Sequence, residues 1–227
     1  MNVLITGASG MVGQAVLQGC LQDPAVRRIL LLGRKPLNLA DPRVHEILRA
    51  DLADLAGLEP TLEGLDACFY CMGVSSAGLP EPEYERLTYR LAVEVGETLA
   101  RLSPGMTLVY VSGAGTDSSE KGRIIWARIK GKTENALLAL PLRAAYMLRP
   151  GMIVPMDGVR SSTRSYQLFY DLAKPVLPLL HQLFPRKILS SREIAEVMLL
   201  LARLGYDKPI LETGDMRDLL NAQKTND

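Results

Sequence analysis

A glycine-rich segment between an apolar run and an amphipathic stretch constrains this chain more than any other feature. Residues 2–6 are largely apolar and β-branched, and residues 11–21 carry apolar side chains at helical spacing. Between them, Gly7, Gly10 and Gly13 stand in the order TGASGMVG. This context predicts a strand, a tight turn and a helix. Gly7 permits the chain to leave the strand sharply, Gly10 lets a ligand approach the backbone closely, and Gly13 lets the helix pack tightly on the strand. The arrangement is typical of a turn that binds the diphosphate of a dinucleotide.

The helix after this turn is expected to present unpaired N–H groups and the positive end of its dipole to the phosphates. Besides the three glycines, we expect cofactor contacts from Ser9, Met11 and Val12. The alternative is a glycine-rich connection between a strand and a helix that binds nothing. The strand before the turn and the helix after it count against that alternative.

The rest of the chain alternates apolar runs with helical patterns. Strands are expected at 29–32, 44–48, 67–71, 107–111, 144–148 and 209–211, and helices at 81–102, 121–140 and 193–204. Such alternation predicts an α/β fold, a Rossmann-like doubly wound parallel sheet with helices on both faces. At 227 residues the chain fits one domain, in which residues 151–189 are expected to form a small C-terminal substrate cap. The polar residues 222–227 are expected to fray.

Composition disfavours several classes of function. The 26 basic and 25 acidic side chains leave a formal net charge of +1, which provides no field to attract nucleic acid. The apolar pieces are shorter than the roughly 20 residues of a membrane-spanning helix, so no membrane span is expected. His45 and His181 are far apart in the sequence without a thiol or carboxylate cluster, so no metal site is expected. Three cysteines, and no basic segment before the first apolar run, favour a reducing, cytoplasmic location.

The end of the second expected strand indicates which cofactor the turn takes. A fold of this type that binds NAD usually has a carboxylate there for the ribose 2′-hydroxyl, whereas a cation suits a 2′-phosphate. Here Gly33 is followed by Arg34 and Lys35. The two cations favour NADP over NAD, and the alternative is a solvated pair of surface cations.

Asp51 and Leu52 follow the third expected strand and are also candidates for cofactor contact. The Asp51 carboxylate is placed to accept a hydrogen bond from the adenine amino group. It could equally cap the short helix that is expected next. Both roles stay open for this side chain.

These positions combine into a recognisable pattern. It consists of Gly7, Gly10, Gly13, Arg34, Asp51, Cys71-Met72-Gly73, Ser112, Lys130 and the segment RPGMI at 149–153. With these motifs, residues 1–155 resemble the atypical or extended short-chain dehydrogenases, and most closely their NmrA-like and Tat-interacting-oxidoreductase-like branch. The resemblance implies further cofactor contacts at the ends of the fourth and sixth strands, from Cys71, Met72, Gly73, Pro150, Gly151, Met152 and Ile153.

The resemblance also implies catalytic roles at the end of the fifth strand and on the helix after it. In the family a serine, here Ser112, orients the substrate carbonyl, and a lysine, here Lys130, binds the nicotinamide ribose. A tyrosine four residues before the lysine protonates the carbonyl, and Trp126 holds that position here. An indole N–H donates a hydrogen bond but does not lose its proton near neutral pH, so the usual acid–base cycle has no carrier.

Three interpretations of Trp126 stay open. It polarises the carbonyl while water, Tyr166 or Tyr170 supplies the proton; it stacks over the substrate or the nicotinamide; or catalysis is lost and the fold senses the cofactor. The expected function is therefore an NADP(H)-binding oxidoreductase acting on an unidentified small carbonyl or alcohol. The alternative is a non-enzymatic NADP(H)-sensing regulator that binds a protein partner. The helix at 81–102 is expected to face the sheet or a second subunit, which leaves a homodimer open.

Overall fold

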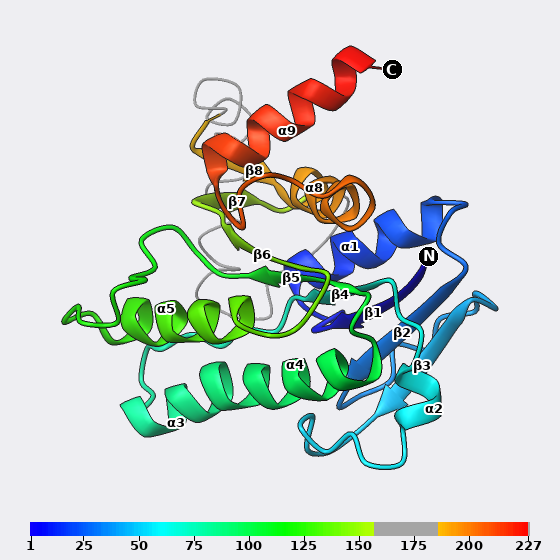
Figure 1. Ribbon diagram of the computed structural model, residues 1–227, viewed down its shortest axis with the longest axis horizontal. Helices are drawn as coiled ribbons and strands as arrows, with labels where there is room; N and C mark the ends of the chain where they lie inside the picture. The colour runs from blue at the N-terminus through cyan, green and yellow to red at the C-terminus, as the bar shows by residue number, and fades with distance from the viewer. Residues whose placement is uncertain (157–185, 227) are drawn as a thin grey trace.

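Seven strands form one parallel sheet at the centre of the molecule (Figure 1). Their order is β3-β2-β1-β4-β5-β6-β9, and every neighbouring pair is parallel. The strands are β1 (Asn2–Thr6), β2 (Arg28–Gly33), β3 (Val44–Leu48), β4 (Ala67–Tyr70), β5 (Thr107–Val111), β6 (Ala144–Arg149) and β9 (Ile210–Glu212). The strand order reverses at β1, since β2 lies on one side of it and β4 on the other. A doubly wound sheet binds its ligand at the carboxyl ends of the strands at such a point.

The computed structural model describes residues 1–156 and 186–226, and in these the predicted α/β fold is confirmed. A separate pair of parallel strands, β7 (Met152–Val154) and β8 (Ile188–Ser190), flanks the remaining segment. Most of the expected cap at 151–189 lies outside the described residues, together with Tyr166, Tyr170 and His181. A single domain with this cap stays a prediction. Within 1–156 and 186–226, no helix has the length and apolar character needed to cross a bilayer.

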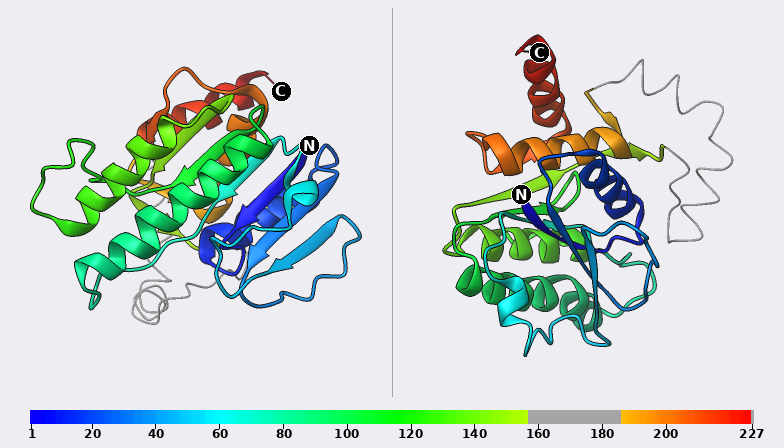
Figure 2. Two further views of the ribbon diagram at one scale, coloured as in Figure 1. Left: turned by 60° about the horizontal axis from the view of Figure 1, so that its bottom comes forward. Right: turned by 90° about the vertical axis from the view of Figure 1, so that its right-hand side faces the viewer.

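Helices cover both faces of the sheet (Figure 1). One face carries α1 (Met11–Gln22) and α8 (Ser191–Leu204), with α9 (Thr213–Asn226) outside α8 (Figure 2). The other face carries α3 (Glu81–Glu85), α4 (Leu91–Leu102) and α5 (Ile125–Leu138), and the short α2 (Glu59–Leu62) precedes β4. Burial on both faces explains why β1 is a continuous apolar run: Val3 and Ile5 belong to the core under α1 and α8, and Leu4 to the core under α4.

Three helical segments differ from the prediction, each for a local reason. A π-helical turn, η1 (Arg86–Arg90), joins α3 to α4, so the expected helix at 81–102 is continuous but widened. The expected helix at 121–140 begins only at Ile125, because the Asp117 carboxylate accepts hydrogen bonds from the N–H groups of Ser119 and Gly122 and holds that segment as a loop. Helix α8 begins at Ser191, where Ser190 and Glu193 form a capping box.

The end of the chain is helical rather than frayed. Helix α9 extends to Asn226, whereas residues 222–227 were expected to be irregular. Its side chains Met216 and Leu220 are fully buried against the core under α1 and α8. Two buried anchors one turn apart stabilise a helix whose sequence is otherwise polar.

Candidate active site

The turn after β1 is packed so tightly that its glycines have no room for side chains. Gly7 has a φ of +71°, and a Cβ there would lie 2.8 Å from the carbonyl carbon of Cys71 and from the nitrogen of Met72. A Cβ on Gly13 would lie 2.1 Å from the Gly7 carbonyl oxygen. The turn is therefore pressed against the end of β4 on one side and against the first turn of α1 on the other, as the glycine spacing predicts.

The amino end of α1 offers unpaired backbone donors. Gly10 is the N-cap residue, with an extended backbone, and no side chain caps the helix there. Its N–H donates to the Gly7 carbonyl at 2.9 Å, and its carbonyl accepts from Gln14 N at 2.9 Å. The first N–H groups of the helix, from Met11 and Val12 onward, point out of the helix end, as at any α-helical amino terminus. Ser9 is exposed beside them, so the turn fits a diphosphate.

The loop after β2 presents two cations at the same edge of the sheet. Arg34 and Lys35 are exposed, and neither forms an ion pair with any residue in the described ranges. The Glu46 carboxylate on β3 fixes this loop, because it accepts hydrogen bonds from Leu37 N at 2.7 Å and from Asn38 N at 2.9 Å. Sequence reasoning missed Glu46, since its partners lie eight and nine residues away.

Asp51 does not cap the short helix that follows it. That helix begins at Glu59 with Leu58 as its N-cap, whereas the Asp51 carboxylate accepts a hydrogen bond from Ala53 N at 3.0 Å in a local turn. Asp51 is exposed and Leu52 half-buried, after the carboxyl end of β3. Of the two roles left open, the structure removes helix capping.

The end of β4 lies beside the glycine turn. Cys71 N donates to the Thr6 carbonyl at 3.1 Å, so the two strand ends remain paired where the turn begins. Cys71 and Met72 are half-buried, and Gly73 is exposed with no atom within 4 Å of where a Cβ would stand. This segment therefore lies beside the glycine turn at the point where the strand order reverses.

Ser112 is held firmly at the end of β5. It is only 9% exposed, and its N–H donates to the Leu148 carbonyl at 2.8 Å. Its Oγ lies 3.0 Å from Oγ1 of Thr116, which donates to the Gly113 carbonyl at 2.8 Å. Sequence reasoning missed Thr116. Because the Thr116 proton is directed to that carbonyl, the Ser112 hydroxyl donates its own proton to Thr116.

The loop between β5 and α5 holds Trp126 against the Ser112 end. A Cβ on Gly115 would lie 3.5 Å from Cη2 of the Trp126 ring, so the indole covers that glycine. Asp117 N donates to the Ala127 carbonyl at 3.0 Å, and a Cβ on Gly131 would lie 1.8 Å from the Asp117 carbonyl oxygen. The loop therefore lies directly on the helix that carries Trp126.

Lys130 lies one helical turn beyond Trp126 and reaches the same strand end. Its Nζ is 3.4 Å from the carbonyl oxygen of Val111, the residue before Ser112, and 5.2 Å from the centre of the Tyr110 ring. Burial lowers the pKa of the Lys130 ammonium group to about 8, against a smaller opposing effect of Glu134. The structure thus brings Ser112 and Lys130 together, as the motif spacing predicts.

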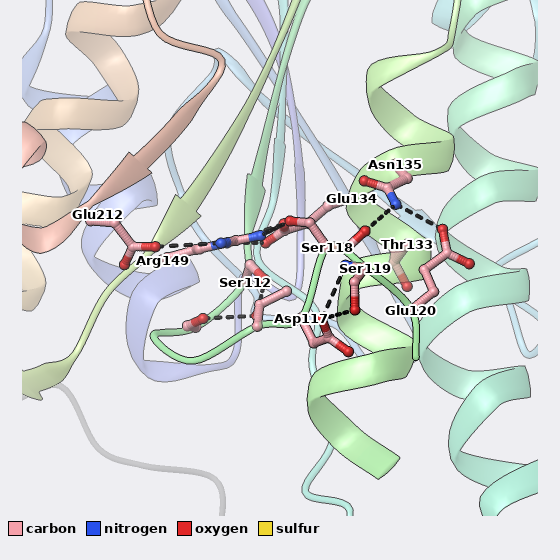
Figure 3. Close-up of polar contacts among 12 residues, drawn as sticks. Ser112, Asp117, Ser118, Ser119, Glu120, Thr133, Glu134, Asn135, Arg149 and Glu212 are labelled. Carbon is pink, nitrogen blue, oxygen red and sulfur yellow. Dashed lines mark hydrogen bonds and ion pairs between the residues drawn. The ribbon is translucent and has the colours of Figure 1, made fainter. Parts of the chain in front are cut away.

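A buried ion pair that sequence reasoning missed joins α5 to the end of β6 (Figure 3). Glu134 has no exposed surface, and its two carboxylate oxygens accept hydrogen bonds from Nε of Arg149 at 3.0 and 3.1 Å. The same guanidinium donates to Ser118 Oγ at 2.5 Å and to the Glu212 carboxylate at 3.4 Å. The hydrogen bonds to Glu134 raise the pKa of Arg149, against a smaller opposing effect of burial.

The segment after Arg149 is anchored at both ends of its turn. The Pro150 carbonyl accepts from Ala114 N at 2.9 Å, and Gly151 N donates to Oγ1 of Thr213 at 2.9 Å. A Cβ on Gly151 would lie 2.8 Å from the Lys187 carbonyl, so glycine is required by close packing. The exposed Met152 and half-buried Ile153 then begin β7.

Comparisons with known proteins agree with the fold and correct one expectation. FMP52-1 of Scheffersomyces stipitis is 21% identical over 99% of both chains, and fmp52 of Emericella nidulans is 29% identical over 72% of this chain and 70% of its own. Both are named as mitochondrial proteins, which contradicts the cytoplasmic location expected here. That expectation was wrong because few cysteines indicate a reducing environment and do not distinguish one reducing compartment from another.

Several solved structures with a similar fold were determined in complex with NAD. MoeE5 in complex with UDP-glucose and NAD has a TM-score of 0.66 and 16% identity, covering 93% of this chain and 75% of its own. This likeness supports the Rossmann-like fold. Residues 3–120 match the NAD dependent epimerase/dehydratase family, which confirms the resemblance to extended short-chain dehydrogenases. The chain belongs to the NAD dependent epimerase/dehydratase family.

Proposed function

We propose that this protein is an NADP(H)-dependent oxidoreductase that interconverts a small carbonyl compound and its alcohol. The observation that carries the proposal is the shared edge of the sheet: the glycine turn after β1 and the Ser112–Lys130 pair after β5 both lie at the carboxyl ends of parallel strands. A dinucleotide lying along that edge has its diphosphate at the turn and its nicotinamide near Ser112.

The turn fits the diphosphate because Gly7 and Gly13 let the backbone pack closely into this shape and the amino end of α1 supplies N–H groups. Arg34 and Lys35, free of carboxylate partners in the described ranges, bind the ribose 2′-phosphate. This distinguishes NADP from NAD, the cofactor present in the MoeE5 complex.

At the other end of the edge, Lys130 binds the nicotinamide ribose and Ser112 holds the substrate oxygen. When bound, the nicotinamide supplies or accepts the hydride. Trp126 lines this pocket where the family has a tyrosine, and its flat indole provides a stacking surface beside the reacting atoms. The loop held on α5 by Asp117 fixes the indole relative to Ser112.

A second candidate function is a regulator that reports the NADP(H) state to a protein partner without catalysis. Trp126 favours it, because an indole cannot replace the proton-donating phenol. NADPH consumption with a panel of aldehydes, ketones and quinones separates the two functions. Turnover supports the oxidoreductase, whereas saturable NADPH binding with no turnover contradicts it and favours the regulator.

A further inference from the structure

Carbonyl reduction needs a proton donor, and two residues at the strand end cannot fill that role. The indole N–H of Trp126 does not ionise near neutral pH. The Ser112 hydroxyl is hydrogen-bonded to Oγ1 of Thr116 at 3.0 Å. A serine hydroxyl can donate a hydrogen bond that orients a substrate oxygen, but it does not release its proton near neutral pH.

Two further protonated groups are near the strand ends but are poor acids. Tyr110 presents its ring to Lys130, and burial raises the pKa of its phenol above the ordinary value. Burial likewise raises the pKa of the Cys71 thiol at the end of β4. Both groups hold their protons too firmly for effective general acid catalysis near neutral pH.

Lys130 occupies the right place with unused donors. Its Nζ reaches the Val111 carbonyl at 3.4 Å, a long contact that engages one of its three N–H bonds. Within the described part of the chain it forms no ion pair, because the nearby Glu134 carboxylate is occupied by Arg149. The ammonium group therefore lies beside the residue that precedes Ser112 and has N–H bonds available to donate to a substrate.

We propose that Lys130 is the proton donor for carbonyl reduction in this protein, a role that rests on the proposed function. Hydride from the reduced nicotinamide adds to the carbonyl carbon, and the carbonyl oxygen takes a proton as the Lys130 Nζ–H bond breaks. The product is the alcohol, and the neutral amine regains its proton from water. Lys130 therefore binds the cofactor and also serves as the general acid, the role that the tyrosine has in the family.

The electrostatic surroundings of Lys130 suit this role. Burial lowers its pKa to about 8, and a general acid acts best when its pKa is near the working pH. Glu134 on its own helix opposes the shift, and Tyr110 on β5 faces the ammonium group with a neutral ring. On β6, Arg149 is bound to Glu134. Glu85 of α3 and Tyr89 of η1 face Lys132, and Glu81 of α3 pairs with Arg128.

The test compares pH profiles of NADPH-dependent reduction of phenanthrenequinone by the wild type, Lys130→Arg and Tyr110→Phe. The wild-type kcat is expected to be constant below pH 8 and to fall about tenfold per pH unit above it, because the ammonium form is lost. Lys130→Arg keeps a charge for the ribose but cannot release its proton, so kcat should fall about a hundredfold while NADPH affinity changes only a few-fold. Lys132→Arg, on the same helix but paired with Glu85, is the matched control and should behave as the wild type.

A second readout needs no turnover. In protein whose lysines carry ¹³C-methyl labels, the resonance that disappears in Lys130→Arg should titrate near pH 8. Titration of the Lys130 resonance near pH 10 contradicts the proposal. If the wild type is active, the proposal is also contradicted when Lys130→Arg keeps the wild-type kcat and pH profile, or when Tyr110→Phe loses them. A wild type that binds NADPH but reduces no compound of the panel overturns the proposed function and this inference with it.

Discussion

Glu134 and Arg149 form a buried ion pair that joins the helix carrying Lys130 to the segment leading into Pro150 and Gly151. Both carboxylate oxygens of Glu134 accept from Nε of Arg149, and the guanidinium also reaches Ser118 and Glu212 (Figure 3). One side chain therefore links α5, the loop after β5 and the ends of β6 and β9. The geometry of the candidate site depends on this link.

Breaking that pair should destabilise the protein strongly. Glu134→Gln removes the buried countercharge of the Arg149 guanidinium and leaves it with the exposed Glu212 carboxylate at 3.4 Å, so we expect the free energy of unfolding to fall by about 3–5 kcal/mol. Glu212→Gln removes a half-exposed partner of the same arginine and should cost less than about 1 kcal/mol. Urea denaturation of the two variants checks the difference. Equal small losses would show that the buried pair does not hold these elements together.

Cofactor preference should depend on Arg34. In Arg34→Asp the cation is replaced by a carboxylate that repels the 2′-phosphate and suits a ribose hydroxyl. NADPH affinity should then fall about ten- to hundredfold and NADH affinity less than about threefold. Arg27→Ala removes an exposed cation at the amino end of β2, the opposite edge of the sheet, and should change neither. Calorimetric titration measures both affinities. If Arg34→Asp weakens NADPH and NADH binding equally, the proposed contact between Arg34 and the 2′-phosphate is contradicted.

Trp126 provides an intrinsic probe, because it is the single tryptophan of the chain. If the nicotinamide lies beside Ser112, bound NADPH should quench the indole emission saturably, with the affinity found by calorimetry. The ring is half-exposed beside Gly115, and free tryptophan amide at the same nucleotide concentrations is the control for quenching without binding. Calorimetric binding without any change in fluorescence would place the nicotinamide elsewhere.

Trp126→Tyr should restore the usual acid next to Lys130. The phenol at this position is flanked by the ammonium group one turn away, which favours its ionised form. We expect kcat for carbonyl reduction to rise about tenfold or more, with NADPH affinity unchanged. Trp126→Phe keeps the aromatic ring without a proton and should not raise it. A higher kcat in Trp126→Phe would mean that the size of the side chain at this position, and not the proton supply, limits the reaction.

The sequence allowed the sheet and the strand-end residues to be predicted because those signals are local. The boundaries of β1, β3 and β5 coincide with the predicted ones, and the glycine spacing before α1 encodes its own turn. The pairing of Glu134 with Arg149, and of Glu46 with the backbone at Leu37 and Asn38, joins different elements. Charge and spacing along one chain do not reveal such partners.

The late helix α9 could not be predicted for a different reason. Its sequence is polar, and the packing of Met216 and Leu220 against the core stabilises it together with ion pairs such as Arg217–Glu193. The loop at Asp117 is similar, since one carboxylate accepting several N–H groups overrides the helical pattern of the residues that follow. In both cases contacts outside the local sequence decide the conformation.

A crystal structure of the protein with bound NADP⁺ tests the central claim most directly. The account predicts diphosphate density at the turn of Gly7, Gly10 and Gly13, within hydrogen-bond distance of the N–H groups of Met11 and Val12, with the 2′-phosphate at Arg34. Diphosphate density at another place, or a side chain of the protein filling the turn while the nucleotide is bound elsewhere, would contradict it.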